Sequence, residues 1–212
     1  MAVQKIDIDD FIIQAPNFLI IDVRSPGEFE HAHIVSALNL PLFTNEERAI
    51  VGTTYKKQSR EAAIKVGLPL FGTKLLPMIE TVEKWVSEKQ EGAHTTKPNI
   101  LVHCWRGGMR SAAVAWLLDL YGYKVYQLTG GYKAYRNWVL NQFIKDMSIV
   151  DIIVSHNVDF HLRTLMAEYV KFNIQFDFQR FIIIDTISFY HDYGYIKLKD
   201  LASKLKVNIN ND

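Results

Sequence analysis

The sequence predicts an α/β fold with a mainly parallel sheet and helices on both faces, followed by a smaller, incomplete α/β segment. Short apolar runs typical of buried strands alternate with segments whose apolar residues recur at helical spacing. Helix start and stop signals separate these runs. Composition then changes near residue 143, because all six prolines and ten of the eleven glycines precede it. We therefore expect two units, residues 1–143 and 144–212.

The elements of the first unit follow in chain order. Residues 18–22 predict a strand that ends in a carboxylate, after which Ser25 can cap and Pro26 can open a short helix. Residues 43–92 are rich in helix-forming residues. Residues 99–102 and 124–128 predict two further strands, joined by a helix over residues 112–121 that Gly122 can end in a left-handed conformation. Ligands bind at the carboxyl ends of parallel strands, so the turn after residue 102 is the expected site.

Length and charge set limits on the function. A chain of 212 residues that is 49% hydrophobic can bury one substantial core or two small ones. With 24 basic and 23 acidic side chains the net charge is +1, so any RNA contact must come from a local patch. A single cysteine fits a reducing compartment. No apolar run approaches the ~20 residues of a membrane span, and the acidic start does not resemble a secretory signal. We expect a soluble cytoplasmic protein without a membrane partner.

The only cysteine, Cys104, lies on a glycine-bearing turn between a strand and a helix. Glycines let the backbone curl so that N–H groups point inward, and the following helix adds the positive end of its dipole. Such a loop stabilises an anion, here the thiolate and whatever group the sulfur attacks or carries. The predicted catalytic residues are Cys104, Arg106 and Arg110, and the predicted anion-binding loop comprises Trp105, Gly107, Gly108, Met109 and Ser111. The alternative is a buried structural cysteine.

Three other groups receive structural interpretations. Asp22 and Arg24 are expected to support the loop by a salt bridge, and His103 is expected to be a satisfied core histidine rather than a general base. The spacing of His156, His161 and His191 fits no familiar ligand pattern, so no metal site is predicted.

The chain resembles the rhodanese family. Residues 22–24, 28–29, 33–34 and 39–41 are similar to its N-terminal signature, and residues 104–111 to its active-site loop. Ala32 departs from this pattern, since many members carry glycine there. The loop has five residues between cysteine and arginine, as in rhodanese-fold phosphatases and arsenate reductases, whereas the commonest sulfurtransferase loop has four. The resemblance implies a rhodanese-like fold with Cys104 as nucleophile.

Residues 104–111, 47–56 and 130–136 are similar to the rhodanese domain of the tRNA 2-selenouridine synthase family. The resemblance implies replacement of sulfur by selenium in wobble 2-thiouridine of tRNA, by way of a geranylated intermediate. It implies no bound cofactor, with selenophosphate or a sulfur donor as co-substrate and tRNA as partner. The family's second half opens with a phosphate-binding loop, and no Gly-x4-Gly-Lys-Ser/Thr occurs here. We therefore do not expect complete tRNA selenation from this chain alone.

Basic side chains offer contacts for tRNA phosphates. Those on residues 43–92 belong equally well to a solvated amphipathic helix, whereas two others lie in the segment after Gly130. Tyr132, Tyr135, Trp138 and Phe143 recur at helical spacing and are interpreted as core rather than a base-stacking platform. The candidate tRNA contacts are Arg48, Lys56, Lys57, Arg60, Lys133 and Arg136.

The second unit resembles an interior piece of a DnaQ-like 3′–5′ exonuclease, with a ribonuclease H-like fold, over residues 152–160, 184–186 and 197–202. His161 stands where that family has a metal-binding aspartate, and the opening and closing ligand motifs are absent from the sequence, so we expect neither metal nor cleavage. Phe176, Phe178, Phe181 and Phe189 are expected to cover the first unit, mediate association or pack poorly.

A sulfur or selenium transferase is thus the leading hypothesis. The alternatives are a cysteine-dependent phosphatase or arsenate reductase, a non-catalytic binding remnant and, last, an exonuclease.

Overall fold

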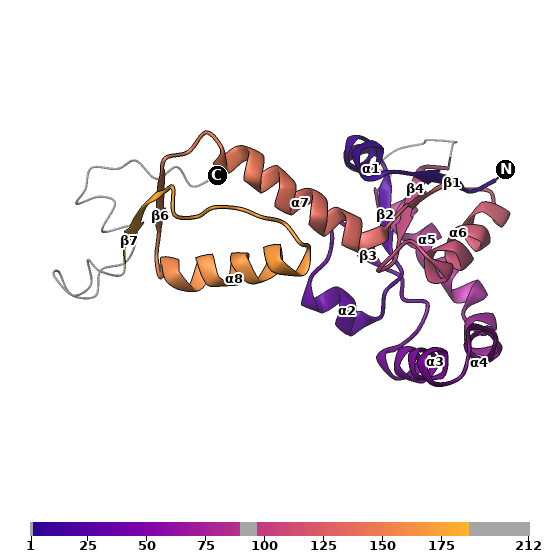
Figure 1. The fold of residues 1–212 in the computed structure, drawn as a ribbon. Coiled ribbons are helices and arrows are strands. Elements are labelled where there is room, and N and C mark those ends of the chain that lie inside the picture. Colours follow the sequence, from indigo (N-terminus) through magenta and orange to yellow (C-terminus); the bar gives the residue numbers. More distant parts are fainter. Residues whose placement is uncertain (1, 90–96, 187–212) are drawn as a thin grey trace. The chain divides into compact units, whose positions relative to one another are not determined.

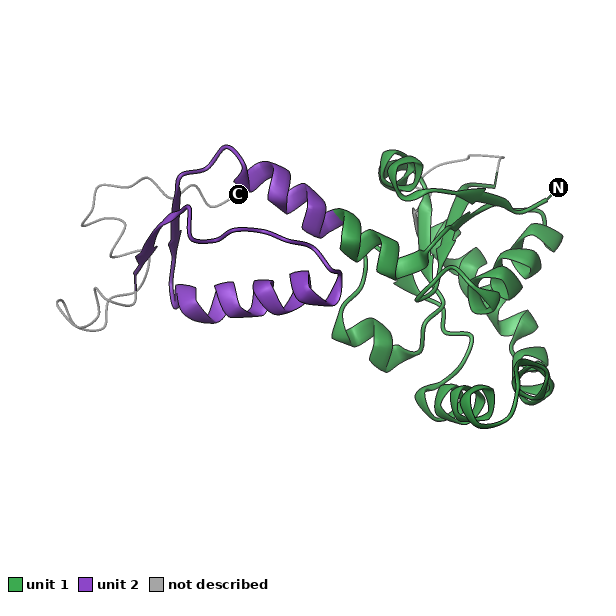
Figure 2. Ribbon diagram, viewed as in Figure 1, with its two compact units in different colours: residues 1–138 green, residues 139–212 purple. Residues whose placement is uncertain are grey.

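The structure is a computed structural model that describes residues 2–89 and 97–186. It divides into two compact units, Met1–Trp138 and Val139–Asp212, shown in Figure 2. The boundary falls within a single helix, α7 (Gly131–Met147), slightly before the change in composition.

Unit 1 is built on one parallel sheet of five strands in the order β1-β5-β4-β2-β3 (Figure 1). The pairing sets Ile21 of β2 beside Val102 of β4, so both strands end at the same edge of the sheet. The mainly parallel sheet predicted from the sequence is confirmed. The strands are β1 (Gln4–Ile6), β2 (Leu19–Asp22), β3 (Leu38–Asn39), β4 (Asn99–His103) and β5 (Lys124–Leu128).

Alternate residues of the central strands enter two different cores. Leu19 and Ile21 of β2 pack with α5 and α6 in one cluster, whereas Ile20 packs with Phe11 of α1 and Tyr132 of α7 in the other. A strand whose side chains are buried on both faces must be covered on both. Helices on both faces of the sheet are therefore confirmed.

The predicted start of α2 and the glycine after α6 are confirmed, and α3 has an N-cap that was not predicted. Pro26 opens α2, Gly122 has φ +96° after α6, and Thr44 accepts a hydrogen bond from the Glu47 N–H at the start of α3. Helix α6 begins at Met109, earlier than the predicted residue 112, so the end of the cysteine loop forms its first turn. The helices are α1 (Ile8–Gln14), a 3-10 turn (Ala15–Asn17), α2 (Pro26–His31), α3 (Asn45–Lys57), α4 (Arg60–Gly72), α5 (Leu75–Lys89) and α6 (Met109–Leu120).

Strand β1 and helix α1 are additions to the predicted elements. Gln4 and Lys5 show no apolar alternation, and β1 exists because its backbone pairs with β5. Residues 43–92 contribute α3, α4 and α5. Within the described residues, no single helix is long and apolar enough to cross a membrane. Helices α4 and α5, with a 59° bend between them, together have the length and composition of a membrane span.

Unit 2 contains a parallel pair, β6 (Ile152–Ser155) and β7 (Ile182–Asp185), joined through α8 (Val158–Lys171). Leu140, Tyr169, Phe178 and Phe181 form its buried cluster, with Phe176 and Phe143 packed against it. Phe176, Phe178 and Phe181 therefore pack inside their own unit. Phe189, His191 and the predicted helix at residues 197–202 lie outside the described residues, and the exonuclease resemblance stays a prediction.

Candidate active site

Cys104 follows the central strand β4 and lies at the carboxyl edge of the sheet. Its side chain is only 3% exposed and belongs to the apolar cluster that faces α5 and α6. The Sγ atom lies 3.2 Å from Oγ of Ser111, in the first turn of α6. The thiol is thus more deeply buried than a turn position suggests.

Two glycines, Gly107 and Gly131, allow the cysteine loop to pack closely against the start of α7. Gly131 has φ +59°, and a Cβ atom there would lie 2.2 Å from the carbonyl oxygen of Cys104. Gly107 has φ +65°, and its Cβ would lie 2.3 Å from the Leu128 oxygen. The N–H groups of Tyr132 and Lys133 donate to the oxygens of Cys104 and Trp105, at 2.8 and 3.0 Å. Helix α7 therefore binds carbonyl groups of the loop, whereas a Cβ at Gly108 would meet nothing within 4 Å.

Gln127 on β5 supports the cysteine loop through its side chain, and it was not predicted as a site residue. Its buried side-chain amide donates to the oxygens of Gly107 and Gly108, at 3.0 and 3.3 Å, and to Ser111 Oγ at 2.8 Å. Ser111 Oγ can donate its own proton either to the Gly108 oxygen at 3.1 Å or to Cys104 Sγ. A polar residue among the four buried residues of β5 is the signal that could have pointed to Gln127.

The two predicted arginines of the loop have different surroundings. Arg106 is exposed. Arg110 pairs with Glu28 on α2, with Nη1 2.6 Å from Oε2. Burial alone raises the pKa of Glu28, but the hydrogen bond and charge of Arg110, together with the Ser25 N–H and the charge of Arg48, outweigh it and lower this pKa. Arg110 is thus held by a carboxylate from a distant helix, a partner that the loop sequence does not specify.

The predicted ion pair between Asp22 and Arg24 is present and buried. Nε of Arg24 lies 3.0 and 2.9 Å from the two carboxylate oxygens, and Nη2 lies 2.6 Å from Oδ2. The guanidinium also lies 4.0 Å from the ring centroid of Tyr132, whose N–H binds the Cys104 oxygen. The pair therefore reaches the loop through the first turn of α7.

His103 is a core residue, as predicted, but it is not satisfied. Neither ring nitrogen makes a well-aligned hydrogen bond, and the nearest charged atom, Asp22 Oδ2, lies 3.8 Å from Nε2. Burial lowers the pKa of His103 to about 4, and the charge of Arg24 lowers it further. The charge of Asp22 and the backbone of Cys104 raise the pKa and only partly offset these effects. The imidazole is neutral at physiological pH and is a poor general base.

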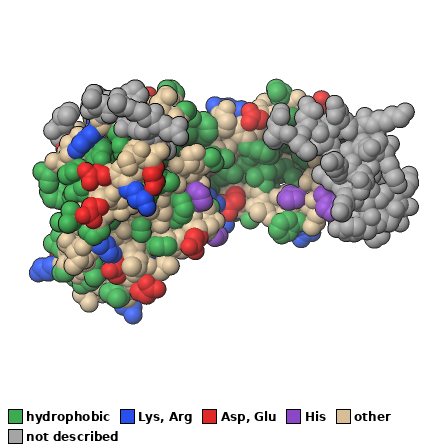
Figure 3. Space-filling view, turned by 180° about the vertical axis from the view of Figure 1, so that it is seen from behind, with side chains coloured by type: hydrophobic (Ala, Val, Ile, Leu, Met, Phe, Trp, Pro, Cys, Tyr) green, Lys and Arg blue, Asp and Glu red, His purple; other side chains and the backbone are tan. Residues whose placement is uncertain are grey.

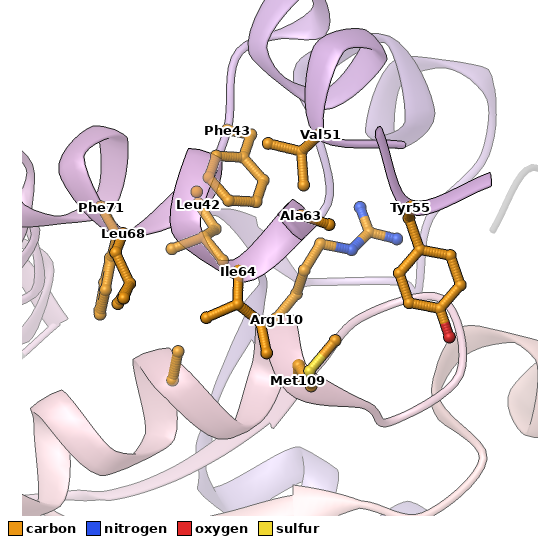
Figure 4. A pocket seen from close by; sticks show the side chains of 12 residues that line it. Leu42, Phe43, Val51, Tyr55, Ala63, Ile64, Leu68, Phe71, Met109 and Arg110 are labelled. Carbon is orange, nitrogen blue, oxygen red and sulfur yellow. The ribbon is translucent and has the colours of Figure 1, made fainter. Parts of the chain in front are cut away.

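An apolar pocket of about 280 Å³ borders the loop. Side chains from α3 and α4 surround it, together with Met109 and Arg110 from the start of α6 (Figure 4). Its polar boundary is the guanidinium of Arg110. Its lining includes Phe43, Val51, Ile64, Leu68 and Phe71.

A second, polar cavity of about 410 Å³ borders the loop at Trp105. Of the six predicted tRNA contacts, Arg48 and Arg136 line it, whereas Lys56, Lys57, Arg60 and Lys133 are exposed elsewhere. On the face shown in Figure 3, acidic and basic side chains are interspersed over unit 1. Among the residues that the structure describes, no group of three or more His, Cys, Asp or Glu side chains could hold a metal ion.

Comparison with known proteins gives consistent results. The rhodanese-like domain family matches residues 9–137. The tRNA 2-selenouridine synthase of Bdellovibrio bacteriovorus is 40% identical over 140 residues, covering 66% of this chain and 35% of that protein. The enzyme of Serratia proteamaculans is 34% identical over 138 residues, covering 65% and 35%. The chain thus spans about a third of the length of these curated relatives.

A solved structure extends this likeness to three dimensions. It is the N-terminal domain of a Clostridium difficile 630 protein described as ATP/GTP binding. That domain is 40% identical, covers 66% of this chain and 99% of its own, and superimposes with a TM-score of 0.56.

Proposed function

Because the chain belongs to the rhodanese-like domain family, we propose that unit 1 is a sulfur or selenium transferase with Cys104 as its nucleophile. We further propose that its acceptor is wobble 2-thiouridine of tRNA in the cytoplasm; the similarity to tRNA 2-selenouridine synthases supports a tRNA substrate. Selenophosphate or a sulfur donor is the co-substrate, and no bound cofactor is needed. The observation that supports this most directly is the lone thiol at the carboxyl edge of the sheet, in contact with Ser111.

The chemistry uses the loop as an anion holder. With a donor such as thiosulfate, the Cys104 thiolate attacks the terminal sulfur, the S–S bond of the donor breaks, and sulfite leaves with the electron pair. The sulfur remains on Cys104 as a persulfide anion. With selenophosphate, attack at selenium gives a perselenide and phosphite, whereas attack at phosphorus gives phosphocysteine and hydrogen selenide. Gln127 and Ser111 would hold the loop around the charged group.

The apolar pocket supports the geranylated intermediate implied by the resemblance. A geranyl chain is wholly apolar, and the pocket beside Met109 and Arg110 offers an apolar lining close to the loop. Burial of such a chain there would be driven by the hydrophobic effect.

Mass spectrometry of the whole protein tests the proposal. After incubation with thiosulfate or selenophosphate, the native chain should gain sulfur or selenium, and Cys104→Ser should gain nothing. The isotope pattern of selenium separates a perselenide from a phosphoryl group. No gain with any donor would leave a non-catalytic remnant, and a phosphoryl group with turnover of phosphate esters would favour the phosphatase alternative.

A further inference from the structure

The polar cavity combines features that suit a particular ligand. It is lined by Arg24, Glu28, Arg48, Trp105, Tyr132 and Arg136, among others. Its volume of about 410 Å³ falls in the range of small-molecule sites. It joins three helices, α2, α3 and α7, to the residue that directly follows the nucleophile. Whatever binds there lies beside the cysteine loop.

The charges in the cavity favour an anion. Arg24 is neutralised by its buried pair with Asp22, and Glu28 is held by Arg110 and more loosely by Arg48, at 3.4 Å. Arg48 is about half exposed, so its guanidinium can turn to a ligand. Burial raises the pKa of the Tyr132 phenol, and the charges of Arg24 and Arg136 partly offset this rise. The charge of Arg136 therefore acts on the Tyr132 side of the cavity. Arg48 and Arg136 therefore add two guanidinium groups to a cavity in which Asp22 balances the charge of Arg24 and Arg110 balances that of Glu28.

The aromatic wall decides which anion fits. Trp105 is half-buried, and its ring lies 5.8 Å from that of Tyr132, which is itself packed under Arg24. A partly exposed indole beside arginines is a stacking surface for an unpaired base. Inorganic phosphate or a small donor would leave this ring, and most of the cavity, without contacts.

We propose that the cavity holds one nucleotide of single-stranded RNA, turned out of its stack. The base lies against Trp105, and the flanking phosphates lie between Arg48 and Arg136. This deepens the proposed function, on which it rests, because it sets the target base next to residue 104. The indole and the arginines of the cavity select an unpaired base of an RNA loop rather than a duplex, whose bases are stacked and paired.

Binding of a stem-loop RNA tests this with the full chain. The probe carries 2-thiouridine in its loop, and a matched RNA has an abasic site there. Replacing the base by an abasic site, or Trp105 by Ala, should weaken the affinity about tenfold or more, and Trp105→Phe should restore most of it. Arg136→Gln and Arg48→Gln should each lower the slope of log affinity against log salt by about 0.7. Lys84→Gln removes an exposed cation on α5, at 74% exposure, and is the charge control.

The outcomes separate this inference from the proposed function. Loading of native Cys104 by a donor, measured without RNA, tests only the transferase. If the native chain loads but binds both RNAs equally, or if the arginine variants keep the native salt slope, the nucleotide site is wrong. The site would instead belong to the donor if inorganic phosphate displaces the RNA whether or not the base is present. Circular dichroism of each variant shows that a lost affinity is not lost folding.

Discussion

Each unit contains a strand, a turn and a helix whose turn is held by a residue of the neighbouring parallel strand. In unit 1, Gln127 of β5 holds the turn between β4 and α6 by donating to carbonyl oxygens and to Ser111. In unit 2, Asp185 of β7 holds the turn between β6 and α8 by accepting from the N–H groups of Asn157 and Val158, at 2.8 and 3.0 Å. The two turns are therefore held from the same position on the neighbouring strand, but by a hydrogen-bond donor in unit 1 and by an acceptor in unit 2.

This difference explains why only one turn is a candidate active site. A carboxylate already occupies the positive end of α8, as an anionic ligand would. In unit 1, the neutral amide of Gln127 donates to carbonyl groups of the cysteine loop and adds no negative charge to the loop. The strands also differ in burial: β2 is buried throughout, whereas Ile152 of β6 and Ile182 of β7 are 49% and 61% exposed.

The largest effect is expected from Gly131→Ala. The new Cβ would meet the Cys104 oxygen at 2.2 Å and the Gly107 nitrogen at 2.5 Å, in a left-handed conformation. We expect a loss of at least about 3 kcal/mol in the unfolding free energy of unit 1. All four tryptophans lie in unit 1, so their fluorescence in urea reports this unit. Gly108→Ala is the matched control and should change stability by less than about 0.5 kcal/mol; a similar loss in both would show that the close contact is not the cause.

Gln127→Glu makes the unit 1 turn chemically like that of unit 2. A buried carboxylate would then face the oxygens of Gly107 and Gly108, so we expect a loss of roughly 3 kcal/mol at pH 8. Because protonation restores one donor, the loss should be smaller at pH 5. Urea melts at the two pH values measure both. A variant as stable as the native chain at pH 8 would remove Gln127 from the support of the loop.

His103 should make unit 1 sensitive to acid. Its pKa is about 4 in the folded chain and near 6.5 when unfolded, so the unfolded state binds more protons between these values. Stability should therefore be fully present above pH 6.5 and fall, by at most about 1.4 kcal/mol per pH unit, as the pH drops towards 4.

His103→Leu should remove this acid-sensitive limb, as measured by urea melts from pH 7 to 4. His156, exposed in the unit 2 turn directly after β6, offers His156→Leu as the control. An unchanged limb in His103→Leu would assign the acid sensitivity to other groups.

The smallest effect is expected from Asp185→Asn. The amide oxygen can still accept from one of the two N–H groups, of Asn157 or Val158, but the NH2 group that replaces the second carboxylate oxygen cannot accept from the other, and the charge at the start of α8 is lost. Unit 2 should lose about 1 kcal/mol, seen as faster amide hydrogen exchange in α8, while the tryptophan transition of unit 1 stays unchanged. Equal exchange rates would mean that the charge of Asp185 does not stabilise this helix.

Elements whose signals are local could be predicted from the amino-acid sequence. The strands around residues 18–22, 99–102 and 124–128, the caps at Ser25 and Gly122, and the placement of Cys104 after a buried strand all depend on neighbouring residues. Short-range periodicity and cap chemistry are sufficient for them. Strand β1 escaped prediction because its stability comes from pairing with β5, far along the chain.

Only the tertiary structure decided which side chains meet. The Glu28–Arg110 pair joins residues 82 positions apart, and Gln127 reaches the loop from the next strand. Likewise, Arg48 and Arg136 line one cavity although α3 and α7 lie far apart in sequence, whereas Lys56 and Lys57 at the end of α3 do not. A contact between distant segments depends on the crossing of parallel strands and on helix packing, which no short stretch of residues encodes.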